Sequence, residues 1–110
     1  MNEDLAHLTN EVIQFRDERG WKQFHTLKDN SLSILIEASE LAEAVRWKED
    51  GDVSDEALSD ELADVLYWTL LTAHDRGINL ADALRSKLAA NAVRYPVDQA
   101  FGNFKKYDQL

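Results

Sequence analysis

The chain has 110 residues, 45% of them hydrophobic, with a formal net charge of −9 and no cysteine. The lack of cysteine excludes disulfides, thiol catalysis and cysteine-ligated zinc, and the acidic balance argues against a broad nucleic-acid-binding surface, which needs a basic patch. No apolar run approaches the roughly 20 residues of a membrane span and the first residues are unlike a signal peptide, so we expect one cytoplasmic domain over residues 1–110, without nucleic-acid or membrane partners.

Apolar residues spaced three and four apart predict helices along the whole chain, and no segment alternates like a strand. Gly20 and Gly77 end two of the helices, Ser54 and Asn79 stand at N-cap positions, and Pro96 stops the last helix. The predicted helices span residues 2 or 3 to 18, about 31 to 47, 55 to about 76, and 80 to about 95. A loop over residues 20–30 and a short C-terminal tail complete an all-α fold with a four-helix antiparallel bundle-like core.

Two pairs of carboxylates share the pattern Glu-x-x-(Glu or Asp) on neighbouring predicted helices. Glu37 and Glu40 belong to the second helix, and Glu61 and Asp64 to the third. Residues three apart share one helix face, and both pairs border the apolar stripe of their helix. If the helices pack antiparallel across the acidic turn at residues 49–53, Glu37 lies opposite Asp64 and Glu40 opposite Glu61. Clustered carboxylates repel one another unless a cation lies among them, and Mg²⁺ or Mn²⁺ prefers oxygen ligands.

Such pairs also arise by chance on solvated faces in a chain with 21 acidic residues. Two features favour a metal site: the acids border the core stripe, and they occur in register on two helices that we expect to be neighbours. A diiron bundle would need Glu-x-x-His pairs, and the histidines, His7, His25 and His74, do not stand at those positions.

Hydrogen-bond donors follow one face of the fourth predicted helix. Lys87, Asn91 and Arg94 are spaced four and three apart, with Tyr95 next to them. Three donors in a row suit an extended phosphate chain, although the same row also fits a solvated face. The lysines at 105–106 are weaker candidates for the same role.

Aromatic residues gather around the carboxylate pairs in the sequence. Trp47 follows Glu40 by seven residues, Trp68 follows Asp64 by four, and the loop before the second helix contains Trp21, Phe24 and His25. Aromatic rings beside a phosphate and metal site favour stacking on a nucleobase, and core packing is the alternative for the same residues.

These motifs together resemble the MazG-like nucleoside triphosphate pyrophosphohydrolases, and among them the small dCTP pyrophosphatase branch. The likeness covers roughly residues 10 to 107. It is carried by the segment FRDERGWKQFHTLKD, the two carboxylate pairs, Trp47 in AVRW, the segment KLAANAVRYP and the ending KKYDQL. One departure is Ile36, where many family members carry a second glutamate, and this leaves open the number of metal ions.

The resemblance implies the reaction: a nucleoside triphosphate and water give a nucleoside monophosphate and pyrophosphate. It further implies carboxylate-bound Mg²⁺, Glu37 or Glu40 as the proton acceptor, and homodimers or homotetramers with sites between subunits. The substrate-binding residues that it implies are Trp21, His25, Trp47, Lys87, Asn91, Arg94 and Tyr95, and it favours dCTP as the substrate. Trp68 joins the candidate substrate-binding residues through its position four residues after Asp64. A non-catalytic helical oligomerisation module and a hydrolase of another phosphoanhydride are the alternatives.

Overall fold

The computed structural model describes residues 4–110, and within that range it contains helices and turns but no strand. It divides into two compact units, one ending at Ile78 and the other beginning at Asn79, and each is described by itself. The predicted all-α class is confirmed. The four-helix bundle and the single domain over residues 1–110 stay predictions, because the fourth helix belongs to the second unit. No helix within the described residues combines the length and the apolar character that crossing a membrane requires.

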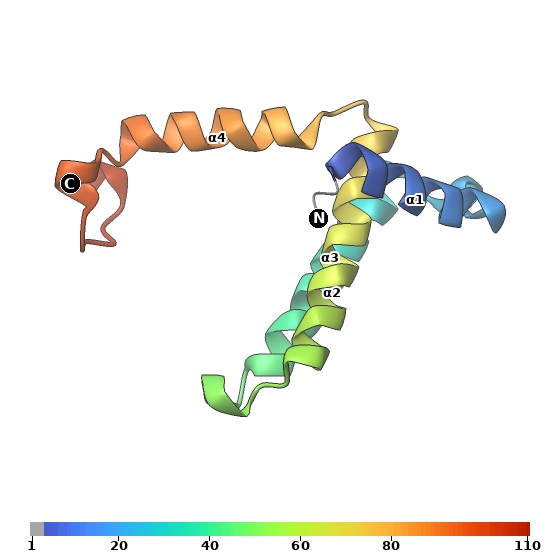
Figure 1. Cartoon of the computed structure of the whole chain (residues 1–110), viewed down its shortest axis with the longest axis horizontal. Helices are drawn as coiled ribbons and strands as arrows, with labels where there is room; N and C mark the ends of the chain where they lie inside the picture. Colours follow the sequence, from blue (N-terminus) through green and yellow to red (C-terminus); the bar gives the residue numbers. More distant parts are fainter. Residues whose placement is uncertain (1–3) are drawn as a thin grey trace. The chain divides into compact units, whose positions relative to one another are not determined.

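The first unit contains three α-helices: α1 (Leu5–Glu18), α2 (Leu27–Val45) and α3 (Asp55–Asp75). Short 3-10 helices at Trp21–Phe24 and Asp50–Asp52 lie in the two connections. Helix α3 contacts both others, and α2 and α3 run side by side in opposite directions (Figure 1). The predicted antiparallel arrangement of the two carboxylate-bearing helices is therefore confirmed.

Side-chain caps and glycines set the helix ends of the first unit. The Asp4 and Ser54 side chains accept hydrogen bonds from backbone N–H groups three residues ahead, as N-caps do. Gly77 adopts a left-handed φ of 65°, and the N–H of Ile78 then donates to the carbonyl of Ala73 at 2.9 Å, which closes the end of α3. The predicted start of the first helix at residue 2 or 3 lies outside the described residues; within them the helix begins at Leu5.

The predicted limits of the second helix were wrong at both ends. Thr26 caps α2, because its hydroxyl accepts from the N–H of Asp29 at 3.1 Å and donates to the Asp29 carboxylate at 2.9 Å. This reciprocal pair begins the helix at Leu27, four residues earlier than the predicted Ser31. The helix ends at Val45, so Trp47 lies in the turn that follows and not on the helix.

The most buried residues of the first unit come from all three of its helices, and among them Asn30 of α2 is 1% exposed. Leu70 and Leu71 are 2% and 0% exposed, and the side chain of Arg16 is 1% exposed. Arg16 donates from Nη1 to both carboxylate oxygens of Asp75, at 2.8 and 2.9 Å. A buried charge needs such a partner, so this ion pair fixes α1 against the C-terminal half of α3.

The predicted apolar stripes of α2 and α3 lie only partly in the seam between the two helices. Leu35 of the α2 stripe and Leu62 and Leu66 of the α3 stripe are 64%, 50% and 43% exposed. Glu37 and Glu61, expected at the border of the seam, are half-buried. These three leucines are therefore more exposed than the two inner acids of the cluster.

The second unit contains α4 (Leu80–Arg94), the single turn α5 (Val97–Ala100) and a 3-10 helix at Tyr107–Gln109. Asn79 caps α4 by accepting from the N–H of Asp82 at 3.0 Å, as predicted. The helix stops before Pro96, whose ring restricts the residue before it to extended conformations.

Candidate metal centre

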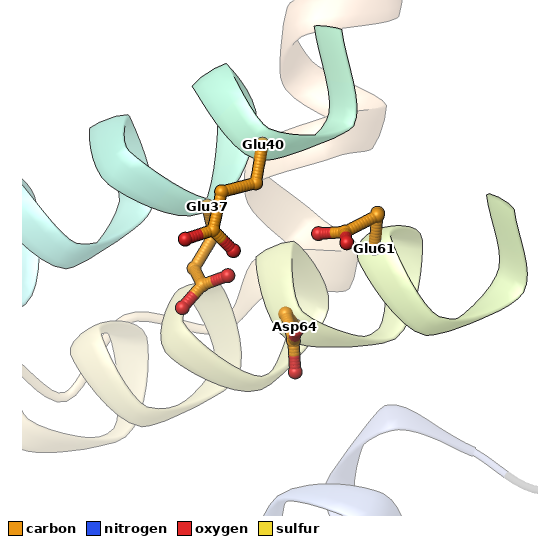
Figure 2. A group of neighbouring side chains, drawn as sticks. All are labelled: Glu37, Glu40, Glu61 and Asp64. Carbon is orange, nitrogen blue, oxygen red and sulfur yellow. The ribbon is translucent and has the colours of Figure 1, made fainter. Parts of the chain in front are cut away.

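The four predicted carboxylates come together in the first unit. Glu37 and Glu40 extend from α2 toward α3, where Glu61 and Asp64 lie (Figure 2). One carboxylate oxygen from each residue lies within 4.8 Å of the corresponding oxygens of the other three. The spacing of three places each pair on one face of its helix, and the antiparallel packing brings the two faces together.

The two pairs each have an inner and an outer member. Glu37 and Glu61 are half-buried, whereas Glu40 and Asp64 are exposed. The Oε2 atoms of both inner glutamates are buried and have no hydrogen-bond partner among residues 4–110. Burying a carboxylate oxygen without a hydrogen-bond partner costs free energy. A bound ligand that contacts both Oε2 atoms would remove this cost.

The cluster raises the pKa of its inner carboxyl groups. Burial and the nearby carboxyl groups of Glu40, Asp64 and Glu61 raise the pKa of Glu37 from 4.5 to about 7. Burial and the charges of Glu40, Asp64 and Asp60 likewise raise the pKa of Glu61. Both shifts have the causes expected for carboxylates that are crowded together and partly removed from water.

The donor set fits a hard divalent cation. All four ligating groups are carboxylates, two of them have buried oxygens without a partner, and no histidine joins the cluster within the described residues. Mg²⁺ and Mn²⁺ take oxygen ligands of this kind, whereas zinc and diiron sites usually include nitrogen or sulfur ligands. A cation among the four groups would also remove their mutual repulsion.

An aromatic contact follows the carboxylates toward the C-terminal end of α3. The rings of His25 and Trp68 meet edge to face with their centroids 5.1 Å apart, and Trp68 lies one turn beyond Asp64. The Nδ1 atom of His25 is buried and has no partner among residues 4–110. The structure thus brings two of the predicted base-binding residues together.

The other predicted aromatic residues of the first unit are more exposed. Trp21 is 41% exposed and its ring centroid lies 5.9 Å from that of Phe15, and Phe24 is 65% exposed. Trp47 is 80% exposed, with the guanidinium of Arg46 4.5 Å from its ring centroid. None of these three rings joins the contact between His25 and Trp68, so their role in binding a base stays a prediction.

The four remaining predicted residues lie in the second unit. Lys87, Asn91 and Arg94 belong to α4, and Tyr95 follows its last residue. The spacing of four and three on a continuous helix places the three donors on one face, as predicted. Their position with respect to the carboxylates stays a prediction.

Sequence reasoning missed two aromatic neighbours of the candidate site. Tyr67 meets Trp68 edge to face at a centroid distance of 5.3 Å, and its other contact, at 6.2 Å, is Phe15. Neither Phe15 nor Tyr67 stands out in the sequence by a motif or a spacing that links it to the carboxylates. Glu43 of α2 is not one of the four clustered carboxylates, and its carboxylate accepts a hydrogen bond from Arg46 at 2.8 Å.

Comparison with known proteins identifies the family. Residues 32–110 match the MazG-like family. The chain is 35% identical to human dCTP pyrophosphatase 1 over 116 residues, which covers 98% of this chain and 66% of the human protein. It is 34% identical to the bovine dCTP pyrophosphatase 1, with 98% of this chain and 67% of that protein covered.

A solved structure gives the same result for the fold. The crystal structure of a pyrophosphatase from Archaeoglobus fulgidus superimposes with a TM-score of 0.78 at 31% sequence identity, over 87% of this chain and 95% of that one. The resemblance drawn from the carboxylate pairs and the flanking motifs is confirmed. The chain belongs to the MazG-like family.

Proposed function

We propose that this chain is a Mg²⁺-dependent nucleoside triphosphate pyrophosphohydrolase that converts a triphosphate and water into a monophosphate and pyrophosphate. The observation that carries the proposal is the convergence of four carboxylates from α2 and α3, two of them with buried oxygens that lack a partner. The relatives named dCTP pyrophosphatase 1 support the same reaction, although the chain spans only 66% of the length of the human one.

Glu37, Glu40, Glu61 and Asp64 would hold the metal ion. Mg²⁺, or Mn²⁺ in its place, would neutralise charge on the phosphate oxygens and acidify water. Of these residues, Glu37 and Glu40 are the proposed proton acceptors. As the water oxygen bonds to the α-phosphorus, its proton passes to one of these carboxylates, and the bond to the bridging oxygen breaks so that pyrophosphate leaves.

Residues outside the cluster would hold the two ends of the substrate. Lys87, Asn91, Arg94 and Tyr95 are the proposed ligands of the triphosphate, because their donors follow one helix face. Trp21, His25, Trp47 and Trp68 are the proposed base-binding residues. The contact between His25 and Trp68, one turn from Asp64, supports this role for two of them. We propose dCTP, or a related deoxypyrimidine triphosphate, as the preferred substrate.

The proposed assembly is a homodimer or homotetramer. Leu35, Leu62 and Leu66 form an exposed apolar stripe on the pair of helices that carries the carboxylates. Burying such a stripe against a second copy would remove apolar surface from water and would place another subunit beside the cluster.

The decisive experiment separates the products of each of the eight common nucleoside triphosphates by chromatography, with Mg²⁺ and without added pyrophosphatase. We expect monophosphate and pyrophosphate, with the highest kcat/KM for dCTP. Diphosphate as the first product would overturn the reaction, and equal kcat/KM values or a purine preference would overturn the selectivity.

A melting experiment tests the alternative of a non-catalytic oligomerisation module. We expect millimolar Mg²⁺ to raise the melting temperature above that in EDTA, because a ligand that binds only the folded state stabilises it. No turnover of any nucleotide, together with a melting temperature indifferent to Mg²⁺, would favour the module instead.

A further inference from the structure

The C-terminal segment of the second unit returns to the end of α4. After Pro96 the chain passes through α5 and comes back at the 3-10 helix Tyr107–Gln109, shown in red beside the last turn of α4 in Figure 1. The ring of Tyr107 meets that of Tyr95 edge to face, with centroids 6.1 Å apart and an interplanar angle of 88°. The guanidinium carbon of Arg94 lies 4.9 Å from the centroid of the same ring.

Tyr107 thus contacts two of the residues proposed to bind the triphosphate. The guanidinium of Arg94 lies over the ring of Tyr107, and its five N–H donors radiate in the plane of the group. Within residues 4–110, Arg94 forms no ion pair. Stacking on Tyr107 therefore restrains the side chain and leaves its donors available for phosphate oxygens.

A second positive charge lies near the same ring. The Nζ atom of Lys106 lies 5.9 Å from the centroid of Tyr107. Two cations near one another repel, and the negative face of an aromatic ring offsets part of that repulsion. The chain has a net charge of −9, so binding an anionic phosphate chain requires local positive charge, which Lys106 and Arg94 can supply.

We propose that Tyr107 is a positioning residue for phosphate binding, which holds Arg94 and Lys106 in place without touching the substrate itself. This role rests on the proposed pyrophosphohydrolase function. The aromatic ring carries the effect, because no hydrogen bond of the Tyr107 hydroxyl group contributes to these contacts.

Kinetics of ring-deletion and ring-preserving variants test the proposal. A Tyr107→Ala substitution should raise KM for the best triphosphate about two- to fivefold, the effect of an exposed cation–π contact, with kcat within about twofold of wild type. Tyr107→Phe keeps the ring and should retain the wild-type KM. Phe104→Ala is the matched control, because Phe104 lies in the same tail, is fully exposed and contacts neither Arg94 nor Tyr95.

Two further measurements separate positioning from a general effect on the fold. In NMR spectra, the Nε–Hε resonance of Arg94 should shift in Tyr107→Ala but not in Phe104→Ala, because the ring current acts only on the stacked group. In a double-mutant cycle, Tyr107→Ala should add no further increase in KM to that of Arg94→Ala.

The outcomes distinguish this role from the proposed function. If the wild-type protein hydrolyses no triphosphate, both the proposed pyrophosphohydrolase function and the positioning role of Tyr107 are overturned. An active wild type whose KM is unchanged by Tyr107→Ala, or for which Tyr107→Phe is equally impaired, would overturn the positioning role alone. Additive effects of the Arg94 and Tyr107 substitutions would do the same.

Discussion

The four carboxylates of the cluster differ in how deeply they are buried. Glu37 and Glu61 are half-buried with unpartnered oxygens, and Glu40 and Asp64 are exposed at the outer edge. The inner pair therefore has most to gain from a cation, while the outer pair lies where a substrate phosphate and water can reach it. This difference leads to two predictions about individual residues.

Neutralising an outer carboxylate should abolish turnover without unfolding the protein. Glu40→Gln or Asp64→Asn removes one anionic ligand and keeps the shape of the side chain, so we expect a loss in kcat/KM on the order of a hundredfold or more. Circular dichroism should show unchanged helix content. Glu43→Gln is the control, because Glu43 pairs with Arg46 outside the cluster. Near-wild-type activity of either variant at saturating Mg²⁺ would remove that residue from the metal ligands.

The metal-free protein should become less stable as the pH rises from about 4.5 to 7. The pKa of Glu37 is raised from 4.5 to about 7 in the folded state, so between these values the folded protein binds more protons than the unfolded chain. Its stabilising contribution is complete below about pH 4.5 and is lost as the pH rises through 7. Thermal melts in EDTA across this range measure the change.

Glu37→Gln supplies the control for this pH dependence, because glutamine stays neutral at every pH. The variant should lose less stability than wild type between about pH 4.5 and 7. Added Mg²⁺ should stabilise the wild type more at about pH 7 than at about pH 4.5, since protons compete with the ion for the carboxylates. Parallel pH profiles for the two proteins in EDTA would contradict the prediction.

At the scale of the elements, a buried ion pair joins α1 to α3. Arg16→Leu removes the partner of Asp75, and we expect the free energy of unfolding to fall by about 3 kcal/mol, the lower end for a broken buried pair. The lower end applies because Asp75 remains 20% exposed and can be solvated. Urea unfolding at one fixed protein concentration measures the loss.

Asp17→Asn is the matched control for the ion pair. Asp17 contacts the Nε atom of the same arginine at 3.2 Å, but it is 52% exposed. Its substitution should change the free energy of unfolding by no more than about 1 kcal/mol, as for other surface pairs. If Arg16→Leu lowers the free energy of unfolding by no more than Asp17→Asn does, the ion pair of Arg16 and Asp75 does not fix α1 to α3.

At the scale of the whole molecule, the exposed leucine stripe should control assembly. Leu62→Asp places a charge in the stripe and should shift the protein toward monomers in analytical ultracentrifugation. Ala63→Asp adds the same charge to the next residue, which points about 100° away around the helix, and should leave the assembly intact. A monomeric wild type, or equal effects of both substitutions, would contradict the proposed interface.

The sequence by itself determined the features that depend on neighbouring residues. The N-caps Ser54 and Asn79, the end of α3 at Gly77 and the two carboxylate pairs follow from the chemistry and spacing of residues a few positions apart. The family could also be read from the sequence, because its motifs combine several such spacings. The start of α2 was missed because the cap formed by Thr26 and Asp29 lay in a segment read as a loop.

Only the tertiary structure decided which side chains from distant parts of the chain meet. The bonding of Arg16 to Asp75, the contact of His25 with Trp68 and the stacking of Tyr107 on Arg94 join residues whose proximity depends on how helices and tail pack. The packing of α2 against α3 also left Glu37 and Glu61 half-buried and Leu35 exposed. The sequence period shows which residues share one face of a helix. Which neighbouring helix covers that face depends on the tertiary packing, and the packing therefore also decides whether a carboxylate at the edge of the face is buried.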